Sequence, residues 1–205
     1  MHHLFVIAVL FSLTLAGAAT AARAAGEKYV LNKPHTQVVF YADHLGFSKS
    51  VGKFTDYEGG FTFDAVHPEQ SSVDVTIKTA SLEMNDEKWN AHLKGPDFFD
   101  VERFPAMTFK GAGVKVLSDN TAEITGDLTL RGMTKPVTLK VTHNKTGAFP
   151  MGKRYVAGFS AAATIKRSEF GMTYGLPAMG DDVVIHLEVE GDRVDQEEPA
   201  PPTQQ

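Results

Sequence analysis

The sequence predicts an all-β protein, an antiparallel β-barrel of about eight strands with a short helical insertion near residues 85–95. Apolar residues recur at every second position in most segments, as half-buried strands require. The segments are joined mostly by short turns, which favours an antiparallel meander over a nucleotide-binding α/β fold. About eight strands can close into one barrel, which is wide enough to be filled by side chains or to hold one small ligand.

Alternating apolar and polar residues identify the strands. The clearest case is residues 73–78, where Val73, Val75 and Ile77 alternate with polar residues. Successive side chains of a strand point to opposite faces, so the pattern predicts one buried face and one exposed face. The same alternation predicts strands within residues 36–43, 60–64, 107–110, 123–131, 137–142, 159–165 and 183–190.

One segment breaks this alternation. Residues 85–94 (NDEKWNAHLK) carry Asp86 and Glu87 near their start, end with Lys94 and are followed by Gly95 and Pro96. Acidic residues near a helix start, a basic residue near its end and a following glycine and proline are helix boundary signals. A short helix is therefore expected between the strands.

Composition limits the functional classes. The 205 residues are 42% hydrophobic, which suits one domain with a sizeable core. A formal charge of −5 and the lack of a basic stretch argue against nucleic acid as a partner. The chain has no cysteine, which removes disulfides, thiolate metal sites and cysteine nucleophiles.

The two ends of the chain read differently from the middle. Residues 4–15 are almost continuously apolar, and Ala22-Arg23-Ala24 is a plausible cleavage site. We therefore expect a signal peptide over residues 1–24, because this run of about 12 residues is shorter than the ~20 that a membrane-spanning helix needs. Residues 192–205 are charged and rich in proline, which predicts a disordered tail after a domain spanning 25–191.

The residues on the predicted inner faces bear on whether the barrel is hollow. Ala42, Gly126, Ala161 and Ala163 occur where a filled core would favour larger side chains, so they leave space. The alternative is a filled barrel in which these alanines face outward. The surrounding aromatic residues would make any such space apolar: Phe40, Phe54, Phe61, Phe98, Phe99, Phe104, Phe109 and Phe159.

Motifs for catalysis and for metal or cofactor binding are missing from the sequence. Neither HExxH nor closely spaced histidines indicate zinc, and neither G-x-S-x-G nor G-x-G-x-x-G occurs. The acidic residues Asp97, Asp100 and Glu102 fit a solvated loop better than a glycosidase pair. His143 and His186 are expected to be solvated. The sequence therefore predicts neither an enzyme, nor a metal site, nor a cofactor.

Two polar residues fall on predicted inner faces. His44 continues the face of Phe40 and Ala42, where its ring could bond either a ligand head group or a backbone carbonyl. Arg167 continues the face of Ile165 and needs a partner if it points inward. That partner is either a group that closes the barrel end or the head group of a ligand.

A series of motifs indicates a family. The motifs are Phe40-x-Ala42-x-His44-Leu45-Gly46, Gly52-Lys53-Phe54, Tyr57-x-Gly59-x-Phe61-x-Phe63-Asp64, His92-Leu93-Lys94, Asp97-Phe98-Phe99-Asp100, Phe104-Pro105, Gly126-Asp127-Leu128-Thr129-Leu130, Ala157-Gly158-Phe159 and Ile165-Lys166-Arg167-Ser168-Glu169-Phe170-Gly171. In their joint order and spacing they resemble the YceI-like family over roughly residues 29–191. One position departs from the pattern, because Trp89-Asn90 stands where members often carry Arg-Asp.

The resemblance implies a lipocalin-like antiparallel barrel, exported to the bacterial periplasm, whose elongated apolar cavity binds a polyisoprenoid chain such as that of a quinone. It implies no enzyme activity. The expected ligand-binding residues are Phe40, Ala42, His44, Phe54, Phe61, Phe98, Phe99, Met107, Phe109, Phe159, Ala161, Ala163, Arg167 and Phe170. Two alternatives remain at this point: a module that binds a membrane redox protein, and an enzyme for a lipid-like substrate that uses His44 and Arg167. A homodimer is a further expectation.

Overall fold

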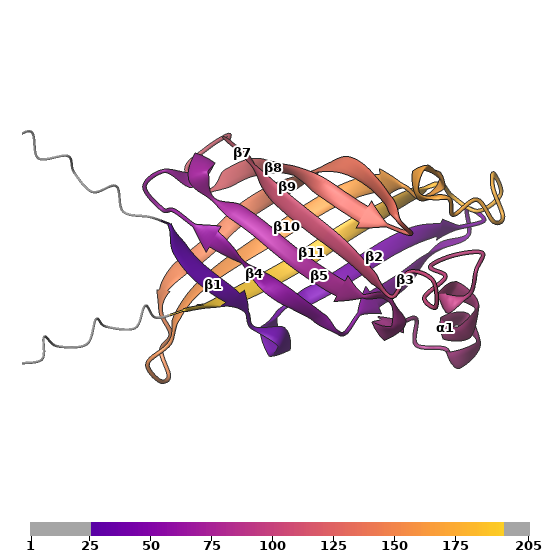
Figure 1. The fold of residues 1–205 in the computed structure, drawn as a ribbon, viewed down its shortest axis with the longest axis horizontal. Coiled ribbons are helices and arrows are strands. Elements are labelled where there is room, and N and C mark those ends of the chain that lie inside the picture. Colours follow the sequence, from indigo (N-terminus) through magenta and orange to yellow (C-terminus); the bar gives the residue numbers. More distant parts are fainter. Residues whose placement is uncertain (1–25, 195–205) are drawn as a thin grey trace, which may run out of the picture.

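The computed structural model describes residues 26–194 and shows a closed antiparallel barrel (Figure 1). Each strand pairs with the next, and the last returns to pair with the first. This confirms the predicted all-β barrel. The strands are β1 (Glu27–Leu31), β4 (Tyr57–Phe63), β5 (Ser72–Lys78), β7 (Ala106–Val116), β8 (Thr121–Leu130), β9 (Met133–Ala148), β10 (Tyr155–Lys166) and β11 (Asp182–Arg193).

Three further strands extend the wall at one end: β2 (Gln37–His44), β3 (Ser48–Phe54) and the short β6 (Leu82–Glu83). Residues 191–193 of β11 pair with β1 and residues 183–188 pair with β2, so β1 and β2 are successive parts of one bent strand. In the same way, β1 pairs with β4 and β2 pairs with β3. The alternation in the sequence did not predict β1, β3 or β6. β3 was missed because its inner face carries the small residues Ser50 and Gly52, and β6 because it has only two residues.

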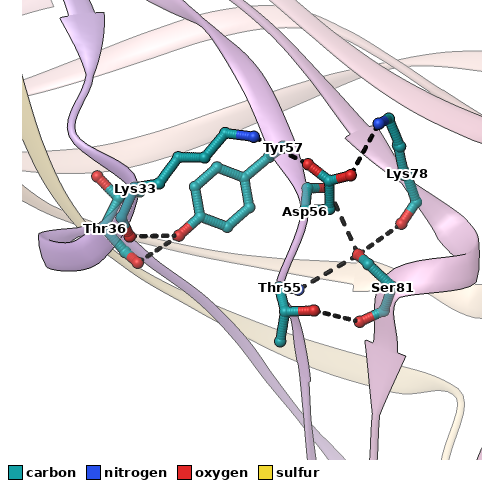
Figure 2. Close-up of polar contacts among 7 residues, drawn as sticks. All are labelled: Lys33, Thr36, Thr55, Asp56, Tyr57, Lys78 and Ser81. Atoms are coloured by element: carbon teal, nitrogen blue, oxygen red, sulfur yellow. Dashed lines mark hydrogen bonds and ion pairs between the residues drawn. The ribbon is translucent and has the colours of Figure 1, made fainter.

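Polar contacts hold the strand breaks together (Figure 2). The carboxylate of Asp56, between β3 and β4, accepts from Lys33 Nζ at 2.9 Å and from Lys78 Nζ at 2.8 Å. The Tyr57 hydroxyl donates to the Lys33 carbonyl oxygen at 3.2 Å, and Ser81 Oγ donates to the Lys78 carbonyl oxygen at 2.7 Å. The break before β2, the break before β4 and the end of β5 therefore meet at one place.

The predicted helix is present as α1 (Glu87–Lys94). Asp86 caps it, since its carboxylate accepts from the Trp89 amide at 2.9 Å, and Gly95 follows its last residue. Figure 1 shows α1 at one end of the barrel, beside the ends of β3 and β5. We call this the α1 end. The far end is the opposite one, where β4 ends and β8 begins. Neither α1 nor any other helix within residues 26–194 is long and apolar enough to cross a membrane.

The well-packed core lies at the α1 end. Its buried members, two of which lie in the loop after α1, are Phe40, Phe54, Leu82, Met84, Phe98, Phe99, Met107, Leu130, Val137, Ile165, Phe170 and Met172. β11 continues to Arg193, so Asp192 and Arg193, which the composition assigned to a tail, are strand residues. The predicted signal peptide and the rest of the predicted tail, from residue 195, lie outside the described residues.

Candidate ligand-binding cavity

The barrel is hollow. It encloses a cavity of about 730 Å³ that runs from His44 and Trp89 at the α1 end to Ser71 and Asn120 at the far end. That volume falls within the range of pockets that enclose small-molecule ligands. The middle of the wall is made of aliphatic side chains from the barrel strands: Val73, Val75, Ile77, Ile124, Leu128, Leu139, Val141, Ile185, Leu187 and Val189.

Most of the predicted ligand-binding residues line this cavity. They are Phe40, Ala42, His44, Phe54, Phe61, Phe98, Phe99, Met107, Phe109, Phe159, Ala161 and Arg167. Two do not line it. Ala163 faces inward but packs against the core at the α1 end, and Phe170 is fully buried in that core. Ala163 follows the period of β10, whereas Phe170 lies in the 3-10 turn that follows this strand, Arg167–Phe170, and that turn places its ring in the core.

Gly126 does not leave space for a ligand, contrary to the expectation from its small size. It faces Gly111 on the neighbouring strand, and the ring of Phe109 lies over it. A Cβ atom at Gly126 would lie 2.7 Å from Phe109 Cζ, closer than real Cβ contacts. Gly191 has the same relationship to Phe61, because a Cβ atom at Gly191 would lie 2.6 Å from Phe61 Cε1. These glycines therefore accommodate rings that would otherwise project further into the cavity.

Aromatic rings form the wall at the far end. The Phe159 ring lies 5.3 Å from Phe61 and 5.2 Å from both Phe63 and His143, measured between ring centroids. His143 is therefore not the solvated side chain that the sequence predicted. Its ring lines the cavity, Nε2 lies 2.8 Å from Thr146 Oγ1, and burial lowers its pKa. The missed signal was the period of β9, because His143 follows Val141 on the inner face.

The other histidine expected to be solvated is exposed. His186 points outward from β11, and its ring contacts the edge of Tyr41 at 5.4 Å. At the α1 end, the His44 ring lies 5.9 Å from the Trp89 ring, and the His92 ring lies 5.4 Å from the Tyr174 ring. All four of these side chains at the α1 end line the cavity. Helix α1 and the loop after Phe170 thus frame that end with aromatic rings.

Arg167 closes the barrel at the same end. Its side chain is 5% exposed and donates to three backbone carbonyls: Nε to Gly180 at 2.8 Å, Nη1 to Met172 at 2.9 Å and Nη2 to Met179 at 3.3 Å. Burial lowers the pKa of Arg167, and the charge of Asp181 opposes that shift. The structure therefore shows the loop-closing contacts that the sequence left as one of two alternatives. Arg167 also lines the cavity.

Sequence comparison places these features in a family. The family model for the YceI-like domain matches residues 29–191, nearly the whole described barrel. The chain belongs to the YceI-like family. A UPF0312 protein of Ectopseudomonas mendocina is 38% identical to this YceI-like chain over 186 residues, which cover 90% of the chain and 97% of the relative. A UPF0312 protein of Pseudomonas aeruginosa is 40% identical over 176 residues, covering 85% and 91%.

Solved structures share the YceI-like barrel. BcnA of Burkholderia cenocepacia is 26% identical with a TM-score of 0.71, covering 78% of this chain and 98% of that one. The Campylobacter jejuni YCEI protein is 30% identical with a TM-score of 0.65, covering 73% and 88%. A polyisoprenoid binding domain from Saccharophagus degradans is 11% identical with a TM-score of 0.62, covering 82% and 99%, and shares the fold.

The Trp89-Asn90 pair of this YceI-like chain has a structural role. Asn90 Oδ1 accepts from the Met84 amide at 2.7 Å, and Asn90 Nδ2 donates to Glu83 Oε1 at 2.6 Å. The amide thus fastens α1 to β6 through one acceptor and one donor. An aspartate at this position could accept from Met84, but it has no N–H to offer Glu83. Trp89 packs at the cavity mouth beside His44.

Proposed function

We propose that this protein binds a polyisoprenoid, or an amphiphile resembling an isoprenoid quinone, and carries or stores it in the periplasm without chemical reaction. The observation that carries the proposal is the cavity of about 730 Å³ with an aliphatic and aromatic wall inside a closed barrel. An apolar chain placed there leaves water, and the hydrophobic effect then favours the complex.

The size of this effect is sufficient for stable binding. Burial of about a dozen tail carbons at roughly 0.8 kcal/mol each gives on the order of 10 kcal/mol before ordering costs. Because hydrophobic burial is not directional, it selects the length and shape of the tail more strongly than its chemical identity. The wall residues alone therefore suit a family of long, thin apolar molecules.

Two further observations support the proposal. A domain with the same fold, from Saccharophagus degradans, is described as polyisoprenoid binding. The apolar segment of residues 4–15, followed by Ala22-Arg23-Ala24, is typical of a signal peptide, which supports export. In an aqueous compartment, a hydrophobic ligand needs a carrier whose cavity shields it from water.

Native mass spectrometry of the exported protein tests the proposal. We expect a mature mass that begins at Ala25, and an additional mass that organic extraction identifies as an isoprenoid or another long apolar molecule. An apo mass that does not change after incubation with isoprenoid quinones and prenols would contradict the carrier function. The interaction module for a membrane redox protein would then be the better hypothesis. A mature mass that retains residues 1–24 would contradict the proposed export.

A further inference from the structure

The charges on the cavity wall are few and unevenly placed. Among the described residues that line the cavity, the acidic ones are Asp43 and Asp119, and the only arginine or lysine is Arg167. Asp119 is exposed on the turn between β7 and β8 at the far end, beside Ser118 and Asn120. Arg167 is at the α1 end. Asp43, next to His44, is at the α1 end with Arg167, whereas Asp119 at the far end has no arginine or lysine of the described lining beside it. The cationic charge of the cavity wall is therefore confined to the α1 end.

Arg167 retains hydrogen-bonding capacity after closing the loop. A guanidinium has five N–H groups, and the three carbonyl contacts use one each on Nε, Nη1 and Nη2. One N–H therefore remains on each Nη atom. Within the part of the chain that the structure describes, Arg167 forms no ion pair with a carboxylate. A buried charge of this kind is costly unless a partner compensates it.

The nearby carboxylates are engaged elsewhere. Asp181 accepts from the Ser168 amide at 2.9 Å and from the Ser168 hydroxyl at 2.8 Å, which lowers the pKa of Asp181. Asp43, which lies between Ala42 and His44 and borders the cavity, accepts from the Gly46 amide at 2.8 Å through Oδ1. Neither carboxylate bonds the guanidinium, although Asp181 contributes a favourable charge nearby.

A second donor lies at the same level of the barrel. Ala42 and Ile165 both pair with Val183 of β11, and His44 and Arg167 follow them by two residues on the same inner face. One strand therefore separates His44 from Arg167, which places their Cα atoms about 10 Å apart at the usual strand spacing. Both side chains line the cavity.

We infer that the ligand is an amphiphile with an anionic oxygen head group, a carboxylate or a phosphate, held at the α1 end between Arg167 and His44, with its tail directed toward the far end. This inference rests on the proposed function and adds the ligand's charge and orientation to it. A charge-assisted bond to Arg167 uses the free N–H groups and neutralises the buried cation. The opposite orientation places the anion beside Asp119, which repels it.

Trp89 makes the orientation measurable, because it is the only tryptophan in the chain and lines the α1 end. Two stearic acid probes are titrated into the delipidated protein, one with a nitroxide near the carboxylate and one with it near the methyl end. The probe with the nitroxide near the carboxylate should quench Trp89 fluorescence more strongly when both probes have the same occupancy. Native mass spectrometry measures this occupancy. Equal quenching, or stronger quenching by the second probe, would overturn the orientation. If neither probe nor any prenol binds, the proposed function itself fails.

A matched ligand pair tests the charge of the head group. Farnesyl phosphate and farnesol share one prenyl chain, and farnesyl phosphate should bind about tenfold more tightly, which corresponds to one charge-assisted hydrogen bond. Arg167→Gln should remove this preference while farnesol binding is retained, whereas Arg154→Gln at the far end should keep it. If Arg167→Gln does not fold, the wild-type pair decides. Equal affinities for farnesyl phosphate and farnesol, or tighter binding of farnesol, would overturn the inference. Binding of stearate, which carries a carboxylate, then shows whether the site accepts anions in general or phosphate alone.

Discussion

The ring of Phe40 lies over Gly52 on the neighbouring strand, and a Cβ atom at Gly52 would collide with Phe40 Cζ and Met84 Sδ. The two residues are directly paired between β2 and β3. The glycine thus lets an inward-pointing phenylalanine lie against the barrel wall. Phe109 over Gly126 and Phe61 over Gly191 repeat this arrangement elsewhere. In each case the missing side chain determines where a ring can lie.

Gly52→Ala should therefore destabilise the protein by about 1–3 kcal/mol, the usual cost of overpacking a tightly packed site. Urea denaturation measures the change in the free energy of unfolding. Gly147→Ala on β9 is the control, since a Cβ there meets nothing within 4 Å. It should be neutral or stabilising, because alanine restricts the unfolded chain. Adding Phe40→Leu to Gly52→Ala should recover part of the loss, and no recovery would contradict the proposed collision.

Ala161→Phe should reduce ligand content more than it reduces stability, because Ala161 lines the cavity. Ala162→Phe is the matched control, since Ala162 is on the outward face of β10, and its ligand content should equal the wild type. Ala163→Phe should instead destabilise the fold, because Ala163 packs against the core. Mass spectrometry after extraction measures ligand content. Equal occupancy in Ala161→Phe and Ala162→Phe would show that the ligand lies elsewhere.

Asn90→Asp should weaken the attachment of α1, because it places a second carboxylate where Asn90 Nδ2 now donates to Glu83 at 2.6 Å. Like charges at such a distance repel, and one carboxyl must then raise its pKa. Faster amide hydrogen exchange in α1 and a lower free energy of unfolding at neutral pH are expected. Adding Glu83→Gln should restore much of the stability. If Asn90→Asp is equally destabilising with and without Glu83→Gln, the repulsion explanation is wrong.

Asp56 should make the strand junction sensitive to acid. Hydrogen bonds from Lys78 and Lys33 lower its pKa from the ordinary value of 3.8. A carboxyl with a lowered folded-state pKa stabilises the protein above the unfolded-state pKa, and this contribution is lost as the pH falls through the folded-state pKa. Asp56→Asn should therefore be less stable than wild type at neutral pH and equal to it in strong acid.

Salt provides an independent check at Asp56, because exposed ion pairs are screened. The stability difference between wild type and Asp56→Asn should shrink in concentrated sodium chloride at neutral pH. Asp74→Asn is a suitable comparison, since Asp74 forms a single exposed ion pair, with Lys110 at 3.0 Å, away from the strand breaks. A difference at Asp56 that does not depend on pH or salt would indicate a packing effect instead.

Much of the barrel could be predicted from alternation alone, as the strands around Val75, Leu139 and Ile185 show. Side chains of a strand must alternate between core and solvent, so local sequence carries this information. The segment Ser48–Phe54 was missed because the small residues on its inner face give no alternation of large apolar and polar side chains. The Phe40 ring of the neighbouring strand covers Gly52 instead. His143 was misjudged because its polarity was weighed above its period.

By itself, the sequence determined most of the strands, the short helix, most of the inner faces and the family, because these depend on residue types at short, regular spacing. Only the tertiary structure decided that the barrel is hollow, that Gly126 holds the ring of Phe109, and that Arg167 closes the end beside His44. Those relationships join residues that are close in space through strand pairing and far apart in the chain. They depend on register and ring orientation, and no local pattern encodes either.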